Sequence, residues 1–214
     1  MEDGVAMGGP AGGGRRKQQA ADTRELLLHA ARDVFDERGY TATTVGAITE
    51  RANTAHGTFY LYFKNKEDVF GQVITGIAAE LYERAVVPTV TVDPNRSADT
   101  TEVAVAALLA VYNDHAGSWR GLYEAALQSS AIRQIWLDLR HTFIDRLVDR
   151  LVELRAAGVA HDLDPVVTAF GLVAMVEFFA FTRAVFDEPT ETQVSEARAV
   201  RELATLWNRA VLKG

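Results

Sequence analysis

One short segment of the chain concentrates side chains that can hydrogen-bond to a polar partner, namely His56, Thr58, Tyr60, Tyr62 and Lys66. The chain has no cysteine, which excludes thiolate nucleophiles, disulfides and cysteine-ligated zinc. We find no nucleophile elbow, phosphate-binding loop or sequence-defined pair of carboxylates. An enzyme using stray His and Glu in a helical cavity is the rival class, but nothing in the pattern supports it. The residues therefore predict binding, not catalysis, with no cofactor and no metal.

Two short helices are expected to position these groups. The first begins at Thr43 or Thr44, both good N-cap residues, and ends near Asn53, which tolerates left-handed backbone. The second covers about residues 55–62. Two short helices joined by about four residues are typical of a helix-turn-helix, whose second helix enters the major groove of DNA. A plain corner of a helical bundle uses the same elements and remains the alternative.

Longer helices must hold this pair, because helices of about eight residues are not stable alone in water. The first is predicted to start at Asp22, which has capping-box spacing with Glu25, and to end at Gly39. The other opens at Asn65 and runs to about residue 86. Phe59 and Phe63, four residues apart on one helix face, should point inward.

The stretch from Thr43 to Phe70, TTVGAITERANTAHGTFYLYFKNKEDVF, closely resembles the DNA-binding region of the TetR family of bacterial transcriptional regulators. The resemblance covers about residues 22–75 and includes Gly57-Thr58-Phe59-Tyr60, Tyr62-Phe63 and Lys66-Glu67. The rest of the chain matches that family only in helix pattern and length. The resemblance implies a DNA-binding set of Thr44, Ala55, His56, Gly57, Thr58, Tyr60, Tyr62 and Lys66.

Physically, Gly57 lets the backbone approach the duplex, and the tyrosines and Lys66 can contact phosphates. The sequence departs from the family pattern at several places. His56 stands where Lys is frequent, so its contact would be weaker or pH-dependent. Gly46 replaces a DNA-facing side chain and Asn53 the turn glycine. Because Ala55 cannot cap, we expect Thr54 to cap the recognition helix.

The charge distribution limits what kind of DNA face is possible. Residues 1–70 carry nine Lys and Arg against ten Asp and Glu, so most of the net charge of −7 lies further on. Any DNA face is then a local patch with salt-sensitive binding. Residues 1–21 have no apolar run of signal-peptide length, so we expect a cytoplasmic protein with a disordered N-terminal tail. Its Arg15, Arg16 and Lys17 fit either a minor-groove arm or a solvated tail.

The composition, 48% hydrophobic and 24% charged, is that of a globular protein, and helical spacing recurs nearly everywhere. We therefore predict an all-α fold in three parts: the tail 1–21, a helix-turn-helix domain 22–70 with a connecting helix to about 86, and a ligand-binding and dimerisation domain 87–214. The break is expected at residues 88–98, which contain Pro88 and Pro94. Helices are expected at about 99–116, 118–128, 130–157, 164–187 and 192–212. The apolar stretch 166–181 is interrupted by Glu177 and is predicted as a buried helix, not a membrane span.

Aromatic residues are abundant in this second domain, as expected either for a dense core or for the ligand cavity that the resemblance implies. The ligand-binding residues predicted are Tyr112, Trp119, Tyr123, Phe143, Met175, Glu177, Phe178 and Phe179. Glu177 could orient a ligand, pair with an Arg across a subunit interface, or face solvent. His115, Glu124 and His141 could be pocket groups or metal ligands, although solvated surface is the simpler interpretation.

The last two helices carry apolar stripes that predict a homodimer, as the resemblance also implies. The interface residues predicted are Val167, Phe170, Gly171, Ala174, Leu203, Leu206, Trp207 and Val211. The sequence thus predicts a regulator, in particular a repressor released from a palindromic operator by a small, largely apolar ligand, with no membrane partner. The alternative is a helical small-molecule-binding or adaptor protein without specific DNA binding.

Overall fold

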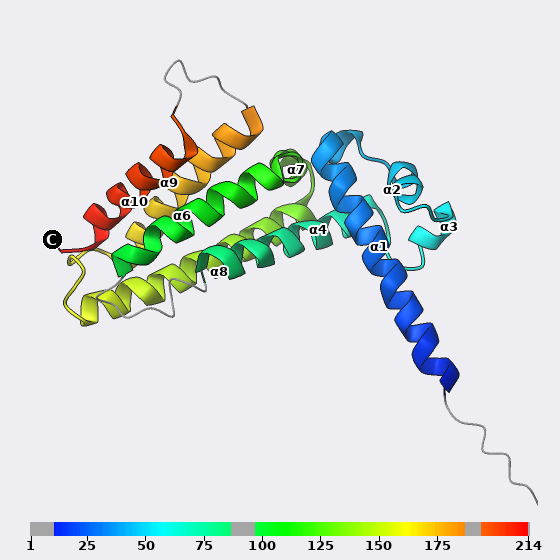
Figure 1. The fold of residues 1–214 in the computed structure, drawn as a ribbon, viewed down its shortest axis with the longest axis horizontal. Coiled ribbons are helices and arrows are strands. Elements are labelled where there is room, and N and C mark those ends of the chain that lie inside the picture. The colour runs from blue at the N-terminus through cyan, green and yellow to red at the C-terminus, as the bar shows by residue number, and fades with distance from the viewer. Residues whose placement is uncertain (1–10, 87–96, 187–193, 214) are drawn as a thin grey trace, which may run out of the picture.

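The computed structural model describes residues 11–86, 97–186 and 194–213 (Figure 1). These residues form helices joined by short turns and contain no β-strand, which confirms the all-α prediction; an isolated bridge joins Ala160 and Leu212. The elements are α1 (Ala11–Ala42), α2 (Val45–Arg51), α3 (His56–Phe59), α4 (Lys66–Leu81), the π-helix η1 (Tyr82–Val86), α6 (Ser97–Asp114), α7 (Ala116–Gln128), α8 (Ser130–Ala156), α9 (Pro165–Phe186) and α10 (Glu196–Val211).

The start and stop signals near the helix-turn-helix act as predicted. The Thr44 hydroxyl accepts the backbone N–H of Ala47 at 3.1 Å, and Asn65 Oδ1 accepts that of Asp68 at 2.8 Å. Each side chain satisfies a backbone donor that has no partner within its helix. Asn53 adopts φ +50°, the left-handed conformation expected at the turn.

Two local predictions were wrong. Helix α1 begins at Ala11 and not at Asp22, so residues 11–21, predicted to be disordered, are helical. Arg, Lys, Gln and Ala, which occupy positions 15–21, are strong helix formers, so propensity extends the helix past the capping signal. Thr54 does not cap α3: its buried hydroxyl has no hydrogen-bond partner among the described residues, and Ala55 stands at the N-cap. Residues 1–10 of the predicted tail and the break with Pro88 and Pro94 lie outside the described residues.

Figure 1 shows α2 and α3 at one end of the molecule, beside α1, and the chain's C-terminus at the opposite end. Helices α6, α8, α9 and α10 form the larger body, and α4 runs from the α2–α3 end along α8. The short helices are held by a core that includes Leu27, Phe35, Ile48 and Phe70, all fully buried. Stability for α2 and α3 therefore comes from packing, as their length requires.

Helix α7 lies directly on the C-terminal part of α1, at the junction between the two ends of the molecule. A methyl group at Gly117 would lie 2.0 Å from the backbone oxygen of Asp36, and one at Gly121 would lie 2.9 Å from the backbone nitrogen of Tyr40. Glycine allows this approach because it has no Cβ. The two glycines are one helical turn apart, so they lie on the same face of α7 and bring its N-terminal half close to α1.

A partly buried polar cluster secures the same contact. The Asp36 carboxylate accepts the backbone N–H of Ser118 at 3.1 Å and contacts His115 Nδ1 at 3.0 Å. On the other side of the ring, His115 Nε2 lies 3.4 Å from Glu80 of α4, and Glu80 also pairs with Arg84. The hydrogen bond with Asp36, supported by Glu80, raises the pKa of His115 above its ordinary value although burial opposes the shift.

We expect Gly117→Ala to lower the free energy of unfolding by about 1–3 kcal/mol, the usual cost of adding a methyl group to a filled contact. The backbone of Asp36 cannot move aside as a side-chain tip could. Chemical denaturation measures the effect. Gly14→Ala is the matched control, because a methyl group there meets nothing within 4 Å. Equal stability of the two variants would contradict the tight packing of α7 on α1.

The His115 cluster predicts a pH-dependent stability. Because the folded pKa of His115 is raised, its stabilisation is fully present below the unfolded pKa of about 6.5 and is lost as pH rises through the folded value. We expect the wild-type melting temperature to exceed that of His115→Gln most at acidic pH, and the difference to shrink as pH rises through the raised folded pKa.

Calorimetry over that pH range tests this, with His141→Gln as control because His141 is exposed. The charged groups that face His115 or its carboxylate partners are Asp36 of α1, Glu80 of α4, Arg84 of η1 and, through Arg84, Asp114 of α6. A pH-independent difference would show that the ring stabilises the junction by packing alone.

Candidate nucleic-acid interface and ligand cavity

The outer face of α3 is polar and accessible. His56, Gly57 and Tyr60 are exposed, Tyr60 by 54%, and Thr58 is half-buried. A methyl group at Gly57 would meet nothing within 4 Å, so the backbone there is open to a large partner. The His56 and Tyr60 rings lie 5.6 Å apart, edge to face, on this surface. The helix therefore presents short hydrogen-bonding groups outward, as insertion into a groove requires.

The inner face of α3 and the turn after it are anchored by two aromatic rings. Phe59 and Phe63 are buried, with exposed fractions of 0% and 1%, and their ring centroids are 5.4 Å apart. This confirms their predicted inward orientation. Tyr62 is half-buried and packs against the same core. The rings fix the direction in which the outer face of α3 points.

Two other predicted contact residues have structural partners. Thr44 is exposed, but its hydroxyl caps α2. Lys66 Nζ donates to the backbone oxygen of Tyr40 at 2.8 Å and lies 4.4 Å from the centre of the Tyr40 ring. Burial lowers the pKa of Lys66. Lys66 thus closes the C-terminal end of α1 against α4, and its phosphate contact stays a prediction.

The structure adds a cation that the sequence argument did not select. Lys64 is exposed in the turn between α3 and α4, next to the recognition helix. Its backbone N–H donates to Asp68, which fixes the turn, while its side chain faces solvent. The position two residues before Lys66, in an otherwise uncharged turn, was the available signal. Arg15, Arg16 and Lys17 are exposed on the N-terminal turns of α1, which projects beyond the body (Figure 1).

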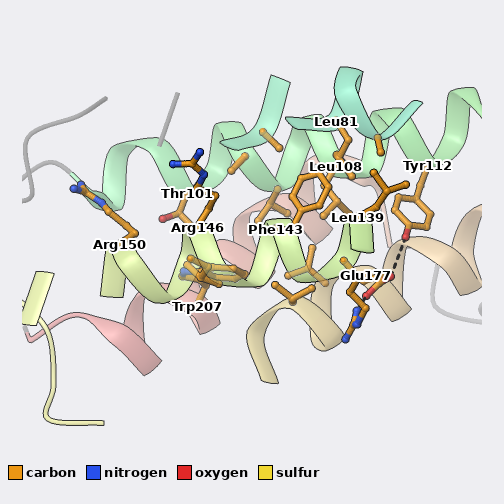
Figure 2. A pocket seen from close by; sticks show the side chains of 18 of the residues that line it. Leu81, Thr101, Leu108, Tyr112, Leu139, Phe143, Arg146, Arg150, Glu177 and Trp207 are labelled. Carbon is orange, nitrogen blue, oxygen red and sulfur yellow. Dashed lines mark hydrogen bonds and ion pairs between the residues drawn. The ribbon is translucent and has the colours of Figure 1, made fainter. Parts of the chain in front are cut away.

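The larger body contains a cavity of about 180 Å³ that is partly open to solvent. Figure 2 shows Leu108, Leu139 and Phe143 along its middle, Tyr112 and Glu177 at one end, and Arg146 and Arg150 towards the other. Trp119 and Leu122 of α7 also line it, so the helix that lies on α1 with one face borders the cavity with another. The cavity is mostly apolar, as small-molecule sites are.

A polar cluster closes one end of the cavity. Glu177 forms an ion pair with Arg140, and the hydroxyls of Tyr112 and Tyr123 donate to its other oxygen at 3.5 and 3.4 Å. Burial raises the pKa of Glu177, although Arg140 and the two hydroxyls oppose the shift. Burial likewise raises the pKa of both tyrosines. Glu177 therefore neither faces solvent nor lacks a partner in its own chain.

Comparison with known proteins decides what this helix-turn-helix belongs to. Residues 27–73 match the family model of the bacterial regulatory proteins of the tetR family. Residues 27–73 therefore form a DNA-binding domain of the TetR family. The chain is 25% identical over 197 residues to the HTH-type transcriptional regulator YhgD of Bacillus subtilis. The aligned residues cover 90% of this chain and 96% of that protein.

Other relatives agree with this assignment. The HTH-type transcriptional repressor BepR of Brucella suis is 42% identical over 60 residues, which are 28% of this chain and 29% of that protein. A solved tetR-family regulatory protein from Rhodococcus RHA1 superposes with a TM-score of 0.69 at 20% identity, over 90% of this chain and 98% of that one. The similarity to the Rhodococcus structure shows that the two proteins share a fold. The matched domain and these relatives together support a DNA-binding transcriptional regulator of the TetR type.

The predicted ligand-binding residues divide into two groups. Four of them line the cavity: Tyr112, Trp119, Phe143 and Glu177. The other four do not: Tyr123 lies behind Glu177, Met175 and Phe179 pack against the core, and Phe178 is 66% exposed. Helical periodicity could not separate them, because every side of α9 is apolar. The sequence argument did not select Arg140, Arg146 and Arg150, which also line the cavity.

The predicted interface residues also divide. Val167, Phe170, Gly171 and Ala174 are exposed on α9, and Leu206 is exposed on α10. Leu203 and Val211 are buried within their own chain, and Trp207 and Val211 line the cavity. Assigning Leu203 and Val211 to a partner was wrong, because α10 packs this apolar face on its own chain. Trp207 is half-buried and lines the cavity, and its place in an interface stays a prediction.

His115, Glu124 and His141 do not meet. His115 lies in the junction, Glu124 accepts a hydrogen bond from Thr41, and His141 is exposed. Within the described ranges, no group of three or more His, Cys, Asp or Glu side chains is placed to hold a metal ion.

We expect Lys64→Gln to weaken DNA binding similarly for all sequences and to reduce the salt slope of the binding constant by about one, because a phosphate contact releases a counterion. Fluorescence anisotropy at several salt concentrations measures both. Lys213→Gln, at the opposite end of the molecule, is the matched control. A slope equal to that of the wild type would remove Lys64 from the interface.

Proposed function

We propose that this regulator is a repressor: a cytoplasmic homodimer that occupies a palindromic operator and is released by a small, largely apolar ligand. The observation that carries the proposal is the place of α7. One face of this helix borders the cavity through Trp119 and Leu122, and another is fitted to α1 through Gly117 and Gly121. A ligand that shifts α7 must therefore shift α1.

The link from α1 to the recognition helix is equally short. Lys66 binds the carbonyl of Tyr40 near the end of α1, and Thr43 donates to the carbonyl of Gly39 at 2.7 Å. Helices α2 and α3 follow directly. A displacement of α1 relative to the body would reorient α3, and a ligand that favours the displaced form would shift the population away from DNA.

A second copy of the chain is the occupant we propose for the exposed face of α9. Val167, Phe170 and Phe178 lie on one stripe of this helix and are exposed by 71%, 42% and 66%. Gly171 and Ala174 lie between them and would allow close approach of a partner helix. An uncovered apolar stripe of this kind marks an interface. With the exposed Leu206 of α10, two copies could form a four-helix bundle.

The same helix has a competing interpretation. By length and composition α9 could cross a membrane, and only 22% of its most apolar window is buried in the single chain. We favour the dimer because its other face carries Leu172, Val176 and Ala180 into the core and Glu177 into an ion pair. The relative BepR, named a repressor, supports the sign of regulation. Dimerisation would place two recognition helices for half-sites about 34–36 Å apart, or a multiple of one helical turn.

We expect Val167→Glu to produce a monomer, because burying an unpaired charge in the bundle costs several kcal/mol. Analytical ultracentrifugation measures the mass, and a mobility shift with DNA upstream of the protein's own gene measures operator binding, which should fall with the dimer. Val152→Glu is the matched control, since Val152 is 50% exposed on α8. A dimeric V167E protein would contradict the α9 interface, and wild-type protein without specific DNA binding would contradict the repressor.

A further inference from the structure

The first part of α1 projects from the end of the molecule that carries α2 and α3 (Figure 1). Every residue from position 14 to position 22 is exposed, so packing against the described chain does not hold this segment. It is helical because it continues α1, which spares it the cost of nucleation, and because residues 15–21 are strong helix formers. Residues 11–22 contain three cations against a single carboxylate, although the net charge of the chain is −7.

Helical spacing places these cations on two different faces of α1. Counted back from the buried Leu27, the inner face of the helix continues through Arg24 to Arg16 and Lys17. Arg15 lies on the opposite face, which is exposed along the helix. None of these three terminal cations is paired with a carboxylate among the described residues. Two of the cations therefore point in the direction in which the inner face of α1 points, and one points away.

Arg24 shows what the inner face of α1 meets at the edge of the body. Its guanidinium lies 5.6 Å from the centre of the Phe63 ring and donates a hydrogen bond to Gln72 of α4. Phe63 stands in the turn that follows the recognition helix α3, directly before the exposed Lys64. Residues 16 and 17 are about 10–12 Å further along the same helix. The two cations thus extend the face that contacts the end of the recognition unit.

DNA held by α3 is the anionic surface next to this segment. An α-helix with its side chains is about 10–12 Å wide and the minor groove of B-DNA about 6 Å, so a helical segment does not fit into that groove. The helical conformation therefore argues against the minor-groove arm that the sequence allowed. Phosphate oxygens line the edges of both grooves, and Arg and Lys side chains reach them from a helix that lies outside the duplex.

We propose that residues 14–24 of α1 form a second DNA-contacting surface, in which Arg16 and Lys17 bind phosphates of the duplex beside the groove that α3 occupies. The contact requires the helix, because the helix directs these two cations and turns Arg15 away. It goes beyond the proposed function, since it depends on DNA binding but on neither the dimer nor the ligand. Phosphates carry no sequence information, so the surface adds affinity without specificity.

Removal of charge tests the contact. We expect the double variant Arg16→Gln, Lys17→Gln to bind DNA at least about fivefold more weakly at physiological salt and to lose about two from the salt slope per bound chain, because each phosphate contact releases a counterion. Arg15→Gln is the matched control and should change neither value. Glutamine is a strong helix former, so the helix is retained in both variants, which circular dichroism verifies.

Fluorescence anisotropy of the full chain at several salt concentrations measures both values. The two probes are the DNA upstream of the protein's own gene and a random-sequence duplex of the same length, and the loss should be equal on both. An unchanged slope in R16Q/K17Q would overturn the proposal. A slope change in R15Q as large as that per cation in the double variant would overturn the placement of the cations by the helix.

A proline separates a directed helix from a flexible basic tail. Ala20→Pro keeps all three cations and breaks the helix between them and the body, and Ala20 is exposed, so the core is unaffected. We expect A20P to lose about as much DNA affinity as R16Q/K17Q, with an unchanged melting temperature. Wild-type affinity in A20P would overturn the proposal in favour of a flexible tail.

The random-sequence duplex also separates this inference from the function beneath it. If the wild type does not prefer its own upstream DNA but R16Q/K17Q still lowers the slope on both duplexes, the phosphate surface stands and the operator-binding repressor fails. If the wild type prefers that DNA and the double variant binds it with the same slope, the repressor stands and the second surface is contradicted.

Discussion

The close approach of α7 to α1 is the contact on which the arrangement of this protein depends. Gly117 and Gly121 bring one face of α7 onto the backbone of Asp36 and Tyr40, and the Asp36 carboxylate binds both Ser118 and His115. Because backbone meets backbone, neither helix can slide or rotate without moving the other. The recognition helix and most of the cavity lining are far apart along the chain. The contact between α1 and α7 connects the helix that precedes α2 and α3 to a helix that lines the cavity.

The two binding regions use charge in opposite ways. The recognition face has few cations among the described residues: Lys64 is exposed beside α3, and Lys66 closes α1 against α4. An acidic protein with so small a basic patch can make few phosphate contacts, so groove contacts must supply a larger share of its affinity for DNA. In the cavity, by contrast, the Arg140–Glu177 ion pair lies where little water can screen it, so each of these charges has a larger effect on its neighbours.

Prediction from sequence succeeded where a signal is local. Thr44, Asn53 and Asn65 mark helix ends because capping and left-handed backbone depend on one residue and its nearest neighbours. Phe59 and Phe63 were assigned inward because they share a helix face. Prediction failed where a residue has two plausible partners. Leu203 and Val211 form an apolar stripe that suits a partner chain as well as α6, and only the packing of α10 shows that the chain itself fills it.

The sequence by itself determined the helical fold, the helix-turn-helix and the family that this segment resembles. Hydrophobic periodicity, capping residues and a gap-free block of matching residues are local features, so they can be recognised without the tertiary structure. Tertiary structure alone decided which side chains face one another. It brought Glu177 of α9 to Arg140 of α8, His115 to Asp36, and Arg146 and Arg150 to the wall of a cavity. The physical reason is that a helix exposes residues in all directions, and the neighbouring helix, which the local sequence does not specify, determines whether a charged group meets solvent, a partner or a ligand.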